Sequence, residues 1–225
     1  MNERPILFSG PMVRAILEGR KTQTRRVCKF VPLHDGLNLQ ANSLQAGLYH
    51  TGWKDGPWVL RSMGGACWND RTKPLRCPYG VPGDRLWVRE TIHQSASGVT
   101  VYAENGCPAW WHGESVQWPW PKAKVVTRGM PRWASRITLG ITNVRVQRVQ
   151  EISEEDAIAE GMLYHDGGRI GHSGWRHDPN YGCIYNTACE AFATGWICIY
   201  SKSGRGWREN PWVWAITFKI LEAGR

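Results

Sequence analysis

The sequence predicts a mixed α+β domain in which helices flank a small, largely antiparallel β-barrel that carries long inserted loops. Apolar residues alternate along 82–90, 135–149 and 211–221, as they do in strands with one buried face. Within 135–149 the alternation changes phase at Thr142-Asn143, which indicates a bulge or a sharp bend of the kind that curves a sheet. Start and stop signals bound three further segments as helices.

The first helix is expected to start after Ser9 and to end at Gly19. Ser9 is a suitable N-cap, Pro11 fits the first turn, and Gly19 can end the helix in a left-handed conformation. The apolar residues recur at the spacing of one buried helical face, and they are Met12, Val13, Ile16 and Leu17.

Two later segments carry helix signals of the same kind. Ser153 precedes three acidic residues at 154–156, a capping-box-like pattern that also complements the helix dipole, and this helix should stop at Gly161. A third helix should run from about Thr187 to Trp196, where apolar residues lie four apart on one face.

The strands should supply the main hydrophobic core. The segment 82–90 starts with a Pro-Gly-Asp turn, and 211–221 is an apolar strand that should close the sheet. The side chains expected in the core alternate along these strands; they are Trp87, Val88, Ile137, Leu139, Ile141, Ile216 and Phe218.

The chain of 225 residues is expected to be a single domain, 1–225, with insertions at about 31–81, 104–131 and 163–185. These insertions lack periodicity, and we interpret them as long loops, which in compact domains act as lids or are disordered. Most of the 14 tryptophans should hold loops to the barrel. The best candidates for stacking on bases crowd into one insertion, and they are Trp110, Trp111, Trp118 and Trp120.

The net charge of +9 predicts attraction to polyanions, so we expect a nucleic acid, RNA more than DNA, or a modified nucleoside as partner. No apolar run approaches the roughly 20 residues of a membrane helix, and the N-terminus lacks the pattern of a signal peptide. We therefore expect a cytoplasmic protein without a membrane partner. The sequence gives no indication of a protein partner.

Seven cysteines in a cytoplasmic chain argue against a disulfide framework. Cys67 and Cys77 could form half of a metal site, completed by Cys107 or His112. No C-x-x-C or H-x-x-x-H spacing supports this, so the cysteines are interpreted as small buried apolar residues, and no metal is expected.

The most informative segment is residues 19–26, Gly-Arg-Lys-Thr-Gln-Thr-Arg-Arg, directly after the first helix. Four cations at a helix exit suit an anionic ligand. Lys21 can also act as a base for the Thr24 hydroxyl if burial or cationic neighbours leave its amine neutral. Residues three apart point to opposite faces of a strand, so such a pair needs a turn or helical backbone here. The simpler interpretation is that Lys21 contacts a phosphate and Thr24 is a turn hydroxyl.

This motif resembles the Gly-x-Lys-x-x-Glu-x-Arg signature of ASCH domains, small β-barrels related to the PUA RNA-binding fold. Gly19, Lys21 and Arg26 match, whereas Thr24 stands where the commoner form has Glu. With Thr24, the motif is similar to that of the small bacterial N4-acetylcytidine amidohydrolases. Their catalytic group is a Lys, a Thr three residues on, and a Glu on a later helix. The overall pattern is most similar to larger ASCH-domain proteins of phages and prophages, which implies a bacterial host cell.

The resemblance implies that Glu160, near the end of the second expected helix, is the third catalytic residue. An acid at a helix C-terminus opposes the helix dipole, at a cost of about 0.3 to 1 kcal/mol, which a facing cation can offset. The alternative is an exposed helix acid without a function.

We therefore hypothesise a nucleic-acid- or nucleoside-directed hydrolase, most concretely an amidohydrolase that acts on an acylated cytosine. Thr24 would be the nucleophile, Lys21 its base and Glu160 their support, with no cofactor. The residues expected to bind the substrate or nucleic acid are Arg20, Thr22, Arg25, Arg26, Trp110 and Trp111. A non-catalytic PUA-type RNA- or DNA-binding module and a ribonuclease that uses the same cleft are the alternatives.

Overall fold

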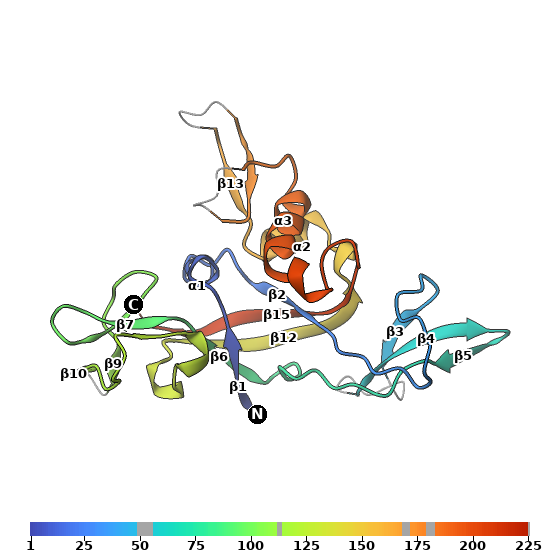
Figure 1. Ribbon diagram of the computed structural model, residues 1–225, viewed down its shortest axis with the longest axis horizontal. Helices are drawn as coiled ribbons and strands as arrows, with labels where there is room; N and C mark the ends of the chain where they lie inside the picture. Colours follow the sequence, from blue (N-terminus) through green and yellow to red (C-terminus); the bar gives the residue numbers. More distant parts are fainter. Residues whose placement is uncertain (49–55, 112–113, 168–171, 179–182, 225) are drawn as a thin grey trace.

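The computed structural model describes residues 1–48, 56–111, 114–167, 172–178 and 183–224. Its centre is a five-stranded sheet in the order β1-β6-β12-β15-β2, in which only the β1–β6 pair is parallel. Figure 1 shows this sheet running through the middle of an elongated molecule. The strands are β1 (Glu3–Leu7), β6 (Arg85–Arg89), β12 (Ile137–Arg148), β15 (Trp212–Ala223) and β2 (Gln23–Val27).

The mixed α+β class is confirmed, but the described strands form an open sheet instead of a closed barrel. β1 and β2 are its two edges, and no backbone pairing between them occurs among the described residues. A side chain links these edges instead, because Arg26 Nη2 donates to the carbonyl oxygen of Leu7 at 2.8 Å. The Arg26 guanidinium thus connects β2 to β1 through a side chain, where the two backbones form no ladder.

The predicted irregularity of the 135–149 strand is present. The register between β12 and β15 shifts between Ile141 and Asn143, where the apolar alternation changes phase. A second shift, between Thr138 and Leu139, has no signal in the sequence. The first shift leaves Thr142 of β12 unpaired and the second leaves Leu221 of β15 unpaired. Such bulges bend the sheet.

The three expected helices are α1 (Gly10–Leu17), α2 (Glu154–Ala159) and α3 (Ala188–Tyr200), the last extending beyond its predicted end at Trp196. Ser153 caps α2 by accepting from Asp156 N at 3.2 Å, and Thr187 forms a capping box at α3. Ser9 occupies the N-cap of α1, but its side chain makes no capping hydrogen bond, contrary to expectation.

The main core lies between α1 and one face of the sheet, and it contains six of the seven expected core residues. The seventh, Trp87, is also buried, but on the opposite face of β6. A smaller cluster packs α2 and α3 onto the other face of β15 through Val213, and a third lies around Ile92 and Met130.

The insertions, and the segment 91–103 before the second of them, contain short strands that the sequence did not predict, because strands of two to seven residues leave little periodicity to detect. β3 (Gln45–Leu48), β4 (Trp58–Gly64) and β5 (Cys67–Asp70) form a sheet at one end of the molecule (Figure 1). At the other end lie β7 (Ile92–Gln94), β8 (Thr100–Tyr102), β9 (Trp110–Trp111), β10 (Glu114–Ser115) and β11 (Lys124–Val125). β13 (Leu163–His165) and β14 (Gly174–Arg176) form a hairpin beside α3.

Short 3-10 turns join several of these elements: η1 (Thr127–Gly129), η2 (Arg132–Ala134), η3 (Val149–Glu151) and η5 (Ser201–Ser203). In the part of the chain that the structure describes, no helix is both long and apolar enough to cross a bilayer.

Candidate functional site

The basic segment after α1 enters the sheet as edge strand β2, instead of the turn or helix that a Lys21–Thr24 pair requires. Alternate side chains of β2 therefore point to opposite faces. Thr24 pairs with Ile216 and faces the main core, whereas Arg25 pairs with Ala215 and faces α2. The sequence did not predict β2, because the side chains that this strand buries are polar and show no apolar alternation.

Lys21 and Glu160 meet although 139 residues separate them. Lys21 Nζ donates to Glu160 Oε2 and to the Glu160 carbonyl oxygen, both at 2.7 Å, and the Lys21 side chain is fully buried. Gly161 permits this approach. It has φ +96°, and a Cβ there would lie 3.1 Å from the Cβ atoms of Lys21 and Ala15.

Arg25 binds the same carboxylate and a second one. Its Nη1 lies 3.3 Å from Glu160 Oε1, and its Nη2 lies 2.7 Å from Asp156 Oδ2. Gln23 completes this layer, accepting from Arg25 Nη1 at 2.6 Å and donating to Asp156 Oδ1 at 3.0 Å. Arg145, on β12, reaches the outer side of Asp156 at 2.8 Å. The two carboxylates of α2 thus face a row of donors from β2.

Sequence reasoning missed Asp156, Gln23 and Arg145. A signal for Asp156 was present, because residues four apart share one helical face and Asp156 stands four residues before Glu160. Gln23 and Arg25 alternate with Thr24, but only knowledge that this segment is a strand makes that spacing informative.

Burial controls the electrostatics of this network. Burial lowers the pKa of Lys21 below its usual range, and the attraction of the Glu160 carboxylate offsets only part of the effect. For Asp156, burial by itself would raise the pKa, but hydrogen bonds from Gln23 and Arg25 and the charges of Arg25 and Arg145 outweigh it and lower the pKa. The site therefore favours an easily deprotonated Lys21 beside an ionised Asp156.

Thr24 is fully buried, and its Oγ1 accepts from Arg26 Nη1 at 2.8 Å. Within the described residues no hydrogen bond joins Thr24 to Lys21. The Phe8 ring lies near Lys21 and Arg26: Lys21 Nζ is 5.7 Å and the Arg26 guanidinium carbon 5.1 Å from the centroid of the ring. Lys21 and Glu160 are thus in contact, whereas Thr24 is bound by Arg26 and not by Lys21 in the described part of the chain.

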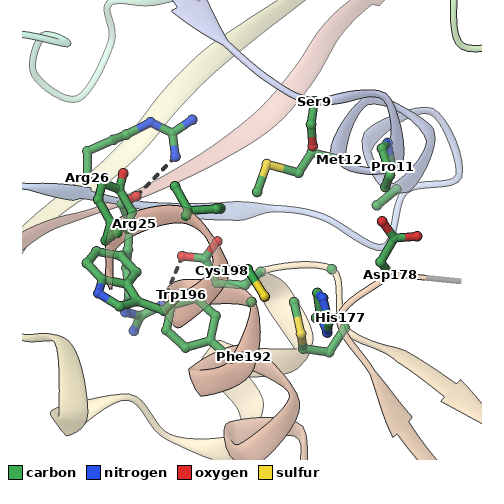
Figure 2. Close-up of a pocket in the computed structure, with 17 residues that line it drawn as sticks. Ser9, Pro11, Met12, Arg25, Arg26, His177, Asp178, Phe192, Trp196 and Cys198 are labelled. Carbon is green, nitrogen blue, oxygen red and sulfur yellow. Dashed lines mark hydrogen bonds and ion pairs between the residues drawn. The ribbon is translucent and has the colours of Figure 1, made fainter. Parts of the chain in front are cut away.

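A cavity of about 260 Å³ opens beside this network between α1, α3 and the end of α2. Arg25, Arg26 and Glu160 form its polar end, and Lys21 and Thr24 are not among its lining residues. Aromatic and aliphatic side chains of α1 and α3 form the walls, as in small-molecule sites. Figure 2 shows Phe192 and Trp196 beside the two arginines, with Met12 on the α1 side.

His177 and Asp178 line the opposite end of the cavity (Figure 2). The His177 ring packs on Gly195 of α3, where an added Cβ would lie 3.2 Å from His177 Cβ. Burial lowers the pKa of His177, and the Asp178 carboxylate opposes this shift without cancelling it. Both residues belong to a predicted insertion and were not predicted as site residues.

The other expected binding residues lie in different places. Arg20 pairs with Glu18 and donates to the Gly161 carbonyl oxygen at 2.9 Å, so it supports the turn after α2. Thr22 is exposed. Trp110 is 59% exposed on β9, at the end of the molecule remote from α2 and α3 in Figure 1. Trp111 lies in β9, but its side chain is outside the described residues.

Trp118 and Trp120 pack on each other, with ring centroids 4.7 Å apart, and Trp120 stacks on Trp133 at 5.8 Å. These two residues were expected as candidates for stacking on bases, but in the structure they pack on other tryptophans and hold the insertion together, the role expected of most loop tryptophans. Of the cysteines considered as metal ligands, Cys67 is exposed and Cys77 is buried in the main core, and His112 lies outside the described residues. The described residues contain no group of three or more potential metal-ligating side chains.

No protein-family model, curated protein or solved structure significantly matches this chain.

Proposed function

We propose that the chain is a hydrolase whose cavity binds a nucleobase or nucleoside, most concretely an acylated cytosine whose amide bond it cleaves. The observation that carries this proposal is the position of Glu160. Its carboxylate is bound by Lys21 and Arg25 and lies at the polar end of a cavity with aromatic walls. Aromatic walls suit the face of a base, and a buried cluster with perturbed pKa values is typical of sites that transfer protons.

The finer fold assignment belongs to the same proposal. An ASCH domain of PUA-like type is supported by the 19–26 motif and by the Lys21–Glu160 contact across the chain. The open sheet, curved by two bulges and bridged at its edges by Arg26, is compatible with an opened relative of a small barrel.

In this mechanism Lys21 is the base. A neutral amine that donates two N–H groups to Glu160 retains a lone pair for the proton of Thr24. This transfer requires substrate binding to bring Thr24, which is bound by Arg26 in the structure, within reach of Lys21. Thr24 Oγ1 forms a bond to the acyl carbon, and the C–N bond breaks as the proton passes from Lys21 to the departing amine. Water then cleaves the acyl-threonine ester and releases the carboxylic acid.

Arg26 controls access to Thr24 in this scheme. Its guanidinium both lines the cavity and binds Thr24 Oγ1. A substrate acyl oxygen at the polar end of the cavity competes for this guanidinium, so that substrate binding releases the Thr24 hydroxyl. The same guanidinium then stabilises the oxyanion that forms on the acyl oxygen.

The second candidate is a non-catalytic module that binds a nucleic acid. The burial of Lys21 and Thr24 favours it, because neither side chain contributes to the cavity wall. In that case the ionic network only stabilises the end of α2. A ribonuclease that uses the same cleft is the third outcome of the test below.

The test is incubation with N4-acetylcytidine, cytidine and single-stranded RNA, following acetate release and strand cleavage separately. We expect acetate release that is lost in Glu160→Gln and Thr24→Ala and retained in Thr24→Ser and in the exposed control Thr22→Ala. Ligand binding without release in any variant would indicate the binding module, and strand cleavage without release would indicate the ribonuclease.

The pH profile tests the role of Lys21. The base must be neutral, so the rate should rise with pH through the pKa of Lys21 in the folded protein, which lies below the usual value of about 10.4. Lys21→Met should remove this limb. A rate that falls with pH across the same range would exclude Lys21 as the base.

A further inference from the structure

A second basic surface lies on β6, on the face opposite the main core. Leu86 and Val88 are buried in that core, so Arg85, Trp87 and Arg89 point to the other side. None of these three residues lines the cavity beside Glu160. The Arg-x-Trp-x-Arg alternation thus has no role in the function proposed above.

The turns η1 and η2 bring further cations to this face. Arg89 Nη1 donates to the Arg128 carbonyl oxygen at 3.2 Å, which places η1 beside the end of β6. The guanidinium carbons of Arg89 and Arg132 lie 4.6 Å and 6.0 Å from the centroid of the Trp87 ring. One indole therefore holds two guanidinium groups in place, which reduces the entropy that they would lose on binding an anion.

The negative charge on this face is small. Among the residues described, the ion pairs of the cluster all involve Glu3, which lies 3.0 Å from Arg132 Nε and 3.9 Å from Arg85 Nη1. Arg89 and Arg128 form no ion pair in the described part of the chain. The segment 116–136, which contains both turns, has five Lys or Arg residues and no Asp or Glu.

An exposed aromatic side chain adjoins the cations. β9 packs beside η2, and its Trp110 is 59% exposed. Figure 1 shows β9 on the side of β6 away from α2 and α3. Fixed cations beside an exposed indole are the combination with which proteins bind single strands, the cations to phosphates and the aromatic ring to a base.

We propose that Arg85, Arg89, Arg128 and Arg132, which lie around the buried Trp87 and are here called the β6 arginine face, bind the phosphate backbone of a single-stranded nucleic acid, with Trp110 stacking on one of its bases. This surface is independent of the cavity and of the function proposed for it. It recognises the backbone and not the sequence, because guanidinium–phosphate contacts carry no base information.

The test measures fluorescence anisotropy of labelled single-stranded RNA and DNA oligonucleotides over a salt series. Arg89→Ala/Arg128→Ala should weaken binding and should reduce the slope of log K against log salt by about 1.4, or about 0.7 for each lost phosphate contact. Trp110→Ala should weaken binding about tenfold and leave the slope unchanged. Arg128→Glu alters one exposed side chain, and it should weaken binding even if the double variant does not fold.

The matched control is Arg205→Ala/Arg208→Ala, which removes the same charge from two exposed arginines outside this face. It should bind like the unaltered protein. Equal weakening in both double variants would overturn the proposal, because only the net charge would then matter. Binding to vesicles of about 30% phosphatidylserine, without binding to either oligonucleotide, would overturn it in favour of a membrane surface.

Discussion

Two regions of this chain concentrate arginine and lysine, and the structure uses them in opposite ways. The cations of the 19–26 segment are the densest in the sequence, yet Lys21 and Arg25 are buried against carboxylates of α2. The cations of the β6 arginine face are spread over β6, η1 and η2; two of them, Arg89 and Arg132, contact the Trp87 ring, and Glu3 pairs with Arg85 and Arg132.

The difference shows that density of charge along a sequence does not determine exposure. A cationic side chain can be buried only where another element presents a carboxylate to it. α2 presents Asp156 and Glu160 on one face, so β2 can direct its cations inward. Among the described residues no helix presents carboxylates to the outer face of β6, and the cations there stay available to a ligand.

The largest expected effect is the loss of Glu160. Glu160→Ala leaves Lys21 and Arg25 buried without their shared carboxylate, which should lower the free energy of unfolding by about 3–5 kcal/mol. Glu3→Ala, the matched change on the β6 arginine face, should cost about 1 kcal/mol or less, because its pairs are solvated. Urea titrations of both variants measure the contrast, and equal losses would contradict it.

The second-largest expected effect is on the pH dependence of the free energy of unfolding, which should differ between the two regions. The pKa of Asp156 is lowered in the folded protein, so its contribution to stability is complete above its unfolded pKa of about 3.9. That contribution is lost as pH falls through the lower, folded pKa. The difference in free energy of unfolding between the unaltered protein and Asp156→Asn should therefore shrink toward low pH.

The matching measurement uses Glu3, whose pKa is lowered by the hydrogen bond from Arg132 and by the charges of Arg132 and Arg85, although burial opposes this shift. Because Glu3 is more exposed, high salt should remove most of its effect and leave most of that of Asp156. A salt response of equal size at both positions would show that burial does not separate the two regions.

The sequence predicted those parts of the fold that leave a periodic apolar pattern. The bulge in β12 was visible because the alternation changes phase at Thr142-Asn143, and α2 was visible from Ser153 and its acids. β2 was not visible, because its inward side chains are Gln23 and Arg25, and polar residues buried by ion pairs have no apolar signature.

The candidate site divides in the same way. The contact between Lys21 and Glu160 was expected from the resemblance of the motif, whereas the hydrogen bond of Thr24 to Arg26, two residues along the same strand, follows from a strand that the sequence did not predict. His177 could not have been predicted from the sequence. It follows directly after β14, and only its packing on Gly195 of α3 brings it to the cavity.

The smallest expected effect lies within the buried network itself, at its outer edge. Arg145 and Arg25 bind the same carboxylate of Asp156, but the Arg145 side chain is 43% exposed and that of Arg25 is fully buried. Arg145→Ala should therefore cost only about 0.2–1 kcal/mol, and added salt should reduce that cost further. Arg25→Ala, which leaves two carboxylates short of a donor, should cost several times more, and salt should change it little.

The two variants remove the same group from the same partner, so chemical denaturation at low and high salt isolates burial as the variable. A loss at Arg145 as large as that at Arg25 would show that the network is solvated throughout, and the contrast between the two basic regions would then fail.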